Sequence, residues 1–382
     1  MSKTFFFVFP FFILVTAQFV FSIFKVLHAP AQDFEVFYLS GKQFLLSQNP
    51  YLLLGKDIVR NPPPALFLFG LFSFAPLIAS QAAWAIFSLG TFFYSSLYFQ
   101  KIIGKVSLVQ TLGFLSLVFL FFPFRYNLGS GQVNNLLLML LTLTFYFLWK
   151  KENWKAGILL ALAISLKFTP LFLLLPLLLR KQIKPLITTI VSLISLALFT
   201  FLFKGGSVFT QYQKVSSSFF DFHISSYYNQ SLTGLLARLQ LSPQLSQQIL
   251  YVSLFLFLII FGIFCYKLKK RGLAGELIIW NSSILTMLIF APFAWQYHFV
   301  ITIFPLVTTF YLISKTKIYN KVFLFLTLGA SYLLLALNIQ SLSFSHIYLS
   351  AIVLSNQLWG SILLLVLNIY LGSRVLKINF TR

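Results

Sequence analysis

The chain has 382 residues, of which 59% are hydrophobic, 19% aromatic and only 9% charged. An ordinary soluble domain carries about 25% charged residues, and on such a domain 49 phenylalanines would leave large apolar patches facing water. The composition therefore excludes a water-soluble globular protein and indicates a protein solvated by lipid.

The formal net charge of +22 does not indicate a nucleic-acid partner. The basic residues lie between apolar runs, where lysine and arginine set membrane topology and meet anionic lipid headgroups. The single cysteine, Cys265, lies inside an apolar run, so the chain forms no intrachain disulfide and no cysteine-based metal site.

Length and hydropathy predict an all-α polytopic membrane protein of about 11 to 13 membrane helices, because each crossing needs about 20 apolar residues. We expect residues 1–382 to form one integral membrane domain. The first run, 5–27, exceeds a signal-peptide core of about 7–15 residues and is interpreted as an uncleaved helix. The later apolar runs are 81–100, 107–124, 133–149, 155–179, 183–203, 249–266, 275–290, 296–314, 321–338 and 348–372.

Clusters of lysine and arginine predict the orientation, because they favour the cytoplasmic side. The two longest connections, 28–80 and 204–248, alternate with these clusters and are predicted to face outward. The clusters are Lys101/Lys105, Lys150/Lys151/Lys155, Arg180/Lys181/Lys184, Lys267/Lys269/Lys270/Arg271, Lys315/Lys317/Lys321 and Arg374/Lys377/Arg382.

Two apolar segments do not fit a simple alternation of crossings. Segment 64–79 follows Pro62-Pro63-Pro64 and is predicted to be an outer-surface or partly inserted helix. Segment 155–179 is basic on both flanks, which favours two short helices meeting near Lys167-Phe168-Thr169-Pro170. A helix broken at membrane depth lines a protein-enclosed cavity, so Lys167 becomes a candidate site residue. A topology-setting or snorkelling lysine is the alternative.

The first outer loop contains a predicted interfacial helix over residues 33–47 that ends at Asn49-Pro50. A simple lipid-surface anchor is the alternative interpretation of this helix. Helical spacing places five residues on one face, namely Phe34, Phe37, Tyr38, Gly41 and Leu45.

Acidic residues are few enough to narrow the choice of a catalytic carboxylate. Asp33 comes directly after the first membrane helix, where a lipid-borne substrate meets the chain, and is the best candidate for a general base. An N-cap of the interfacial helix is the alternative role. The full set is Asp33, Glu35, Asp57, Glu152, Asp221 and Glu276.

Four stretches make the chain resemble glycosyltransferase family 87, whose members are similar to polyprenyl-phosphate-mannose-dependent mannosyltransferases of the GT-C membrane superfamily. The stretches follow one another between about residues 30 and 300. They are Asp33 to Tyr38 with Asn49-Pro50-Tyr51; Asn61-Pro62-Pro63-Pro64; Gly131-Gln132-Val133-Asn134-Asn135 leading into Lys167-Phe168-Thr169-Pro170; and Asn229-Gln230-Ser231-Leu232 with Arg238 and Ala291 to His298.

This resemblance implies a GT-C-like bundle with juxtamembrane helices on its outer face. It implies that Asp33 is the catalytic base and that a Trp-x-x-His element, Trp295 and His298, lies near the active site. The chain departs from the family pattern at Tyr297, where a second histidine is expected, and at Ala294, where serine is expected.

One carboxylate suffices for this chemistry, because a phosphate leaving group departs without protonation by a general acid. A single displacement inverts the anomeric centre, and retention would need a second carboxylate about 5 Å away. The leaving phosphate requires positive charge, for which Lys167, Arg125 and Arg238 are candidates. Interfacial headgroup contacts are the alternative for both arginines, and an aromatic-belt position is the alternative for His298.

The remaining predicted substrate-binding residues are Gln132, Asn134, Asn229, Gln230, Trp295 and Tyr38. No cofactor or obligatory metal is expected, although Asp33-x-Glu35 does not rule out a divalent ion.

The sequence thus predicts a hexosyltransferase, with mannose as the expected sugar, in a bacterial plasma membrane with its active site on the extracytoplasmic face. The expected partners are a polyprenyl-phosphate-sugar donor, a glycan or glycolipid acceptor and membrane lipids. A multipass secondary transporter or flippase is the alternative class, since it shares the number of passes and the broken helices.

Overall fold

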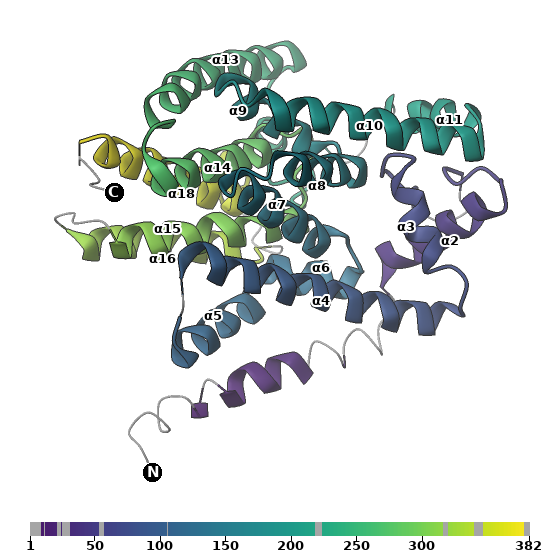
Figure 1. Ribbon diagram of the computed structural model, residues 1–382, viewed down its shortest axis with the longest axis horizontal. Helices are drawn as coiled ribbons and strands as arrows, with labels where there is room; N and C mark the ends of the chain where they lie inside the picture. Colours follow the sequence, from purple (N-terminus) through teal and green to yellow (C-terminus); the bar gives the residue numbers. More distant parts are fainter. Residues whose placement is uncertain are drawn as a thin grey trace. The chain divides into compact units, whose positions relative to one another are not determined.

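The computed structural model describes residues 9–10, 12–20, 24, 31–52, 57–104, 106–217, 224–315, 320–339 and 347–377. The protein is 81% helical, and no strand occurs within these ranges (Figure 1). The predicted all-α class is confirmed. Of the predicted first helix, 5–27, residues 5–8, 11, 21–23 and 25–27 lie outside the described residues, and so does Asp221.

Six helical segments within the described ranges are long and apolar enough to cross a membrane, and a bent pair of helices makes a seventh. Four shorter apolar segments accompany them. These features confirm the polytopic prediction. The six are α4 (Leu77–Ile103), α10 (Ile183–Lys204), α13 (Pro243–Leu268), α14 (Gly272–Ile289), η3 (Gln296–Thr302) continuing into α15 (Ile303–Lys315), and α18 (Asn356–Lys377). The bent pair is α5 (Leu108–Leu120) with α6 (Phe122–Ser130), and the shorter segments are α7 (Asn134–Trp149), α8 (Asn153–Leu166), η1 (Thr169–Leu173) with α9 (Leu174–Leu179), and α16 (Lys321–Ala336).

The predicted break in segment 155–179 is confirmed. Helix α8 ends at Leu166, and the chain resumes as η1 at Thr169. Pro170 explains the break, because a proline ring disfavours α-helical geometry at the preceding residue and supplies no N–H. In segment 64–79, α3 (Ala65–Leu71) has only 7 residues, about 10 Å at 1.5 Å per residue, which is too short to span a bilayer.

The chain forms two compact units, each assembled from separate stretches of sequence. Unit 1 comprises residues 1–144, 157–168 and 188–219, and unit 2 comprises residues 145–156, 169–187 and 220–382.

Unit 1 is organised around α2 (Gln32–Leu45), which lies against α3 and also contacts α4 and α6 (Figure 1). Gly41 permits the close crossing of α2 and α3, because a Cβ atom there would lie 2.5 Å from the backbone carbon of Phe69. The Phe37 and Phe69 rings stack with centroids 4.3 Å apart. The predicted apolar face is confirmed for Phe34, Phe37 and Gly41, but Leu45 is 37% exposed at the end of the helix.

Helix α11 (Ser207–Ser217) follows α10 and completes the described part of unit 1. Its Tyr212 ring packs against the rings of Tyr51, at 5.4 Å between centroids, and Phe168, at 5.9 Å. The segments around Tyr51 and Tyr212 and the end of α8 are therefore joined by an aromatic contact.

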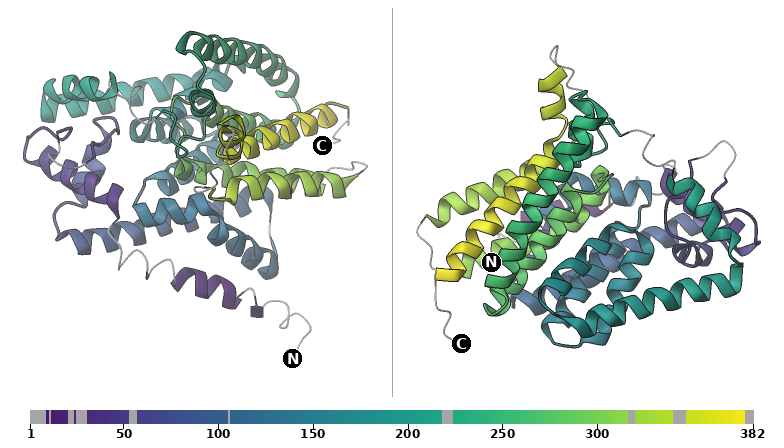
Figure 2. Two further views of the ribbon diagram at one scale, coloured as in Figure 1. Left: turned by 180° about the vertical axis from the view of Figure 1, so that it is seen from behind. Right: turned by 90° about the horizontal axis from the view of Figure 1, so that it is seen from above.

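Unit 2 is built on α14, which packs against α13, α15 and α18, while α16 packs along α18. Figure 2 shows α18, in yellow, running beside the green helices α13 and α14. Two short helices, α12 (Leu232–Arg238) and α17 (Ile347–Val353), contact each other.

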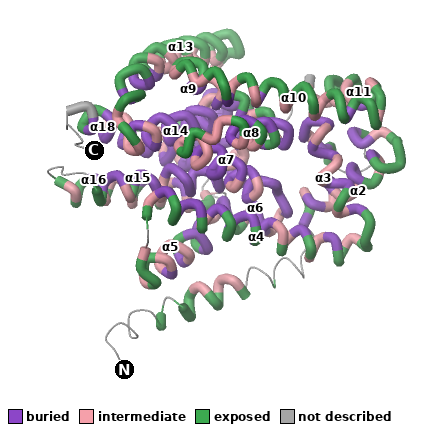
Figure 3. The backbone as a smooth tube through the Cα atoms, in the orientation of Figure 1, coloured by how far each residue is buried: buried purple, intermediate pink, exposed green. Residues whose placement is uncertain are grey.

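The long helices differ sharply in how much of their surface the protein itself covers. The apolar window of α14 is 78% buried, whereas those of α10 and α13 are 11% and 17% buried (Figure 3). Because the exposed residues on α10 and α13 are mainly Leu, Ile, Val and Phe, these helices present the surface expected to face lipid.

Candidate active site

Asp33 lies in the first turn of α2, at the second residue of the helix. The N-cap position belongs to Ala31, and no side chain caps the helix. The alternative interpretation of Asp33 as an N-cap is therefore wrong. Its carboxylate remains favourably placed near the positive end of the helix dipole while its oxygens are left for other contacts.

Gly131 brings the first turn of α2 against the end of α6. It adopts a left-handed conformation with φ of 76°, and a Cβ atom on it would lie 2.4 Å from the Cβ of Phe34. The Trp84 indole Nε1 donates a hydrogen bond to the Gly131 carbonyl oxygen at 2.7 Å. Only glycine meets both requirements, so this turn fixes Asp33 beside Ser130 and Gln132.

The Asp33 carboxylate lies among polar groups in a half-buried position. The side chains of Gln132 and Ser130 interact with it, and Lys167 attracts its negative charge. Burial is nevertheless the largest influence and raises the pKa of the Asp33 carboxyl above its ordinary value of 3.8. Repulsion from Asp57 adds a smaller increase. A carboxylate with a raised pKa is a stronger base, which suits proton abstraction.

Lys167 follows the last residue of α8, and its Nζ donates a hydrogen bond to the Oδ1 of Asn134 at 2.9 Å. The Asn134 Nδ2 in turn donates to the Oδ1 of the buried Asn127, also at 2.9 Å. This chain of amides fixes the ammonium group near Asp33. The structure therefore brings together Asp33, Gln132, Asn134 and Lys167, all of which the sequence had selected.

The Asn61-Pro62-Pro63-Pro64 stretch holds the broken end of α8. The Asn61 Nδ2 donates a hydrogen bond to the carbonyl oxygen of Leu166 at 2.8 Å, and the Tyr51 hydroxyl donates to the Asn61 carbonyl oxygen at 3.0 Å. Carbonyl groups in the last turn of a helix lack intrahelical partners. Asn61 thus stabilises the helix end that precedes Lys167.

Two predicted residues of unit 1 lie apart from this cluster. The Tyr38 hydroxyl donates a hydrogen bond to the Ala75 carbonyl oxygen at 3.0 Å, which ties α2 to the segment after α3. Arg125 is exposed on α6, and its charge has no described effect on Asp33 or Lys167. Their substrate-binding roles stay predictions.

In unit 2, the Asn229 stretch and the Trp295 stretch are joined by an antiparallel bridge. The Gln230 backbone N–H donates to the Ala294 carbonyl oxygen at 2.8 Å, and the Gln296 N–H donates to the Tyr228 carbonyl oxygen at 3.1 Å. The Asn229 side chain also accepts from the Ala294 N–H at 3.1 Å. Two stretches far apart in sequence therefore form one local structure.

Arg238 and Gln230 are engaged in holding the backbone of unit 2. The Arg238 Nη1 donates to the carbonyl oxygens of Ser226 and Asn229 at 2.8 Å each, and its Nη2 donates to the Ser355 hydroxyl at 2.6 Å. The Gln230 amide donates to the carbonyl oxygens of Tyr227 and Leu354 and accepts from the Gln357 N–H. These bonds are structural, and phosphate binding by Arg238 stays a prediction.

His298 is oriented by its own helix start. Its Nδ1 accepts a hydrogen bond from the Trp295 N–H at 3.2 Å, so the proton of the neutral imidazole resides on Nε2. The Trp295 ring stacks on Tyr228 with centroids 5.5 Å apart. Through Nε2, the imidazole is a hydrogen-bond donor, which is the property required to bind an oxygen of a phosphate or sugar.

Sequence reasoning missed the contributions of Ser130 and Asn127 beside Asp33 and Lys167. Their signal was the short polar run that precedes Gln132. Within the described part of the chain, no three His, Cys, Asp or Glu side chains gather as a metal ion would require. The absence of a metal requirement stays a prediction.

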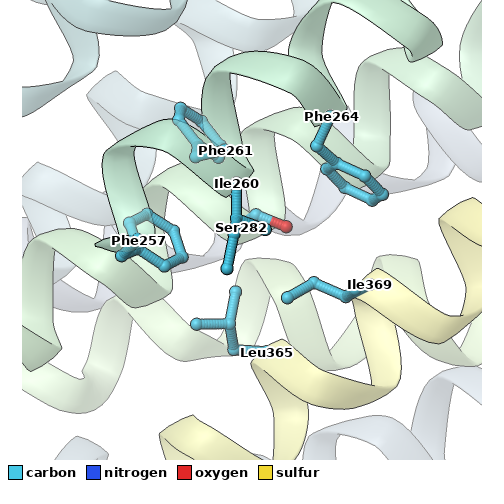
Figure 4. A pocket seen from close by; sticks show the side chains of 7 residues that line it. All are labelled: Phe257, Ile260, Phe261, Phe264, Ser282, Leu365 and Ile369. Atoms are coloured by element: carbon cyan, nitrogen blue, oxygen red, sulfur yellow. The ribbon is translucent and has the colours of Figure 1, made fainter. Parts of the chain in front are cut away.

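A small pocket lies between α13, α14 and α18 in unit 2 (Figure 4). Its lining is aromatic and aliphatic apart from Ser282, and it contains none of the predicted site residues. Its position among apolar helices indicates a gap in helix packing rather than a catalytic cavity.

Comparison with known proteins gives one family match. The model described as "Glycosyltransferase family 87" matches residues 60–292, which is more than half of the chain. No curated protein matches the chain. The matched range includes Gln132, Asn134, Lys167 and Arg238, whereas Asp33 lies before it and His298 after it.

Proposed function

Because this chain belongs to glycosyltransferase family 87, we propose that it transfers a hexose, expected to be mannose, from a polyprenyl-phosphate donor to a hydroxyl group. The proposed acceptor is a lipid-linked or cell-envelope glycan. The observation that carries this proposal is the position of Asp33, whose carboxylate is fixed by the Gly131 turn beside Gln132 and Lys167. Membership in this family favours an enzyme over the transporter or flippase considered as the alternative.

In the proposed reaction, Asp33 removes the proton from the acceptor hydroxyl as the oxygen attacks the anomeric carbon. A positioned general base contributes about 10²- to 10⁴-fold to a rate. The bond between the anomeric carbon and the phosphate oxygen breaks, and its electron pair leaves with the phosphate. The proton on Asp33 then passes to solvent, which regenerates the base.

Lys167 is the proposed partner of the leaving phosphate. Its ammonium group is held by Asn134 at 2.9 Å and lies close enough to Asp33 to influence its charge. A fixed positive charge in a poorly hydrated place stabilises negative charge that develops in the transition state. The same residue therefore balances Asp33 before the donor binds and the phosphate afterwards.

A single displacement with inversion is proposed for the stereochemistry. Retention would require a second carboxylate about 5 Å from the first. The acidic residue that influences Asp33 is Asp57, its effect is the smallest of those described, and it is exposed. No metal is needed for this mechanism, and the distribution of lysine and arginine supports an active site on the extracytoplasmic face of a bacterial plasma membrane.

The test is the Asp33→Asn variant, assayed in membranes supplied with radiolabelled lipid-linked sugars. We expect sugar transfer to fall by at least about 10³-fold, because the amide cannot accept the proton. The folded protein should be retained and its unfolding midpoint at neutral pH should be unchanged or higher, since the variant removes a buried charge. Glu35→Gln, in the same helical turn, is the matched control and should transfer sugar normally.

The pH dependence gives a second measurement. Because the pKa of the Asp33 carboxyl is raised, the active carboxylate is lost as pH falls through that raised value, and the acid limb of the rate should lie above pH 3.8.

Transfer by Asp33→Asn near the wild-type rate would remove Asp33 from the mechanism. Consumption of no lipid-phosphate sugar by the wild-type protein would refute the proposed donor class.

A further inference from the structure

The Gln132 amide interacts with Asp33 through one of its two polar atoms, whereas the other has no hydrogen-bond partner among the described residues. A glutamine bonds a carboxylate through its Nε2–H group, so the interaction with Asp33 directs Nε2 toward the carboxylate. The Oε1 atom is buried and has no hydrogen-bond partner within the described part of the chain. The Gln132 side chain as a whole is only 6% exposed.

The Ser130 hydroxyl on the other side of Gly131 is in the same condition. It is buried and interacts with the Asp33 carboxylate, but its oxygen accepts no hydrogen bond from the described residues. Leaving a buried polar atom unpaired weakens a protein substantially, so native structures rarely retain one without a reason. Unpaired buried polar atoms also occur elsewhere in the described residues, Gln43 Oε1 among them, but these two flank the turn that presents the proposed base. Their position beside Asp33 is what points to a polar ligand at this place.

We propose that Ser130 and Gln132 bind a second hydroxyl of the acceptor, next to the hydroxyl that Asp33 deprotonates. This inference rests on the proposed function and deepens it. Gln132 Oε1 and the Asp33 carboxylate are hydrogen-bond acceptors on two side chains that interact with each other, and together they match two neighbouring O–H donors. The acceptor class is therefore a sugar or other polyol with adjacent hydroxyl groups, rather than an isolated alcohol.

The geometry also separates the two roles of Gln132. Its Nε2 positions Asp33, whereas its Oε1 is a specificity-determining contact with the acceptor. A loss of positioning changes the rate for every acceptor and shifts the pH profile. A loss of the Oε1 contact changes only the discrimination between acceptors that have and lack one particular hydroxyl.

The experiment uses octyl α-D-mannopyranoside and its four monodeoxy analogues as acceptors, with purified full-length protein and a labelled lipid-phosphate sugar. For the wild type, we expect kcat/KM to fall by about 10- to 100-fold for one analogue whose hydroxyl is adjacent to the attacked position. In Gln132→Leu, the ratio of kcat/KM for the parent glycoside to kcat/KM for that analogue should fall below about threefold, because the Oε1 atom that binds the hydroxyl is gone. Ratios for the other analogues should be unchanged.

The matched control is Gln43→Leu. Gln43 also has a buried, unpaired Oε1 and lies on α2, but it is not among the groups that act on Asp33. Its discrimination ratios should equal those of the wild type. Gln132→Leu should in addition move the acid limb of the pH profile upward, since the Asp33 carboxylate loses a hydrogen bond that favours its charged form.

The inference is overturned if Gln132→Leu lowers kcat/KM by one common factor for all five acceptors, because the residue would then be a positioning residue only. Failure of the proposed function has a different signature, namely no donor consumption by the wild type. In that event, saturation-transfer NMR with the same five glycosides still tests the contact. A signal that one deoxy position weakens in the wild type but not in Gln132→Leu supports it, and identical binding of all five to both proteins overturns it.

Discussion

The polar clusters of the two units differ in how their hydrogen-bonding capacity is used. In unit 2, Asn229, Gln230 and Arg238 direct nearly all of their hydrogen bonds to backbone carbonyl groups and neighbouring side chains, and of these three only Arg238 keeps an unpaired atom, its Nε. In unit 1, Asp33 and Lys167 retain opposite charges, and Gln132 keeps an unpaired acceptor. Both clusters contain residues selected by the same family resemblance. Hydrogen-bond accounting thus separates residues that maintain the fold from residues available for chemistry.

The difference has a physical cause. A loop buried against helices must satisfy its peptide groups, and the amide and guanidinium side chains of unit 2 supply those bonds. A catalytic cluster must instead leave bonds for the substrate, and it therefore tolerates burial of charge and of unpaired atoms. If this distinction holds, substitutions in the polar cluster around Asp33 change catalysis, and substitutions in the cluster around Asn229, Gln230 and Arg238 change stability.

Gly131→Ala should give the largest effect among the substitutions that leave every charged group in place. The new Cβ atom would lie 2.4 Å from the Cβ of Phe34, so the first turn of α2 must move. The backbone at this position also has a positive φ, which alanine disfavours. A displacement of about 1 Å in a catalytic group costs about 10²-fold in rate, and we expect a loss of that size in kcat.

Gly129→Ala is the matched control for this substitution, because a Cβ atom there meets nothing within 4 Å. Alanine favours the helix, by about 1 kcal/mol in a helix interior, so this variant should be slightly more stable and fully active. Equal activity of the two alanine variants in the sugar-transfer assay would show that the Gly131 turn does not fix Asp33.

Lys167→Met should reduce kcat/KM for the donor by about tenfold to 100-fold, because the leaving phosphate loses a fixed positive charge. The measurement is initial rate against donor concentration. Lys204→Met removes another lysine at a helix end of unit 1 and serves as the control. An unchanged donor dependence in Lys167→Met would assign Lys167 to membrane topology instead.

Much of unit 1 followed from sequence patterns. The break after Leu166 was predictable because Pro170 and flanking lysines act locally, and helix α2 was predictable from its spacing of apolar residues. The N-cap interpretation of Asp33 failed because helix boundaries shift by one or two residues without a clear sequence signal. The contact of Gly131 with Phe34 depends on tertiary packing between distant segments and leaves no local pattern.

The dependence on tertiary packing also explains why the role of Arg238 in unit 2 was not predictable from the sequence. The sequence identified Arg238 as a cation near polar motifs, which is typical of a phosphate-binding residue. Whether the guanidinium meets a phosphate or a carbonyl group depends on where the Ser226 and Asn229 peptides lie, and only the folded chain determines that. Composition therefore predicts charge and depth in the membrane, but not the partner of each charge.

Arg238→Gln is expected to affect stability rather than donor use. Its hydrogen bonds to two carbonyl groups and one hydroxyl are lost, at about 1.5–3 kcal/mol for a bond to a charged group, so thermal unfolding in detergent should occur at lower temperature. Activity per folded molecule should stay within about threefold of wild type. Ser355→Ala, which removes one of these bonds, should have an intermediate effect. A rise in donor KM matching that of Lys167→Met would instead establish Arg238 as a phosphate ligand and erase the distinction between the units.

Lys204→Met should have the smallest effect, and it sharpens the comparison from within unit 1. The Lys204 Nζ donates to the Leu45 carbonyl oxygen at 3.1 Å and lies 4.9 Å from the Phe44 ring centroid, so it stabilises the C-terminus of α2, the end far from Asp33. A cation at a helix C-terminus contributes about 0.3–1 kcal/mol. We therefore expect a small decrease in the unfolding temperature and a change in transfer rate below about twofold, with Lys42→Met in the same helix as the control. A tenfold loss of transfer would mean that the far end of α2 governs the position of Asp33, and that the polar cluster of unit 1 is less locally fixed than the Gly131 turn implies.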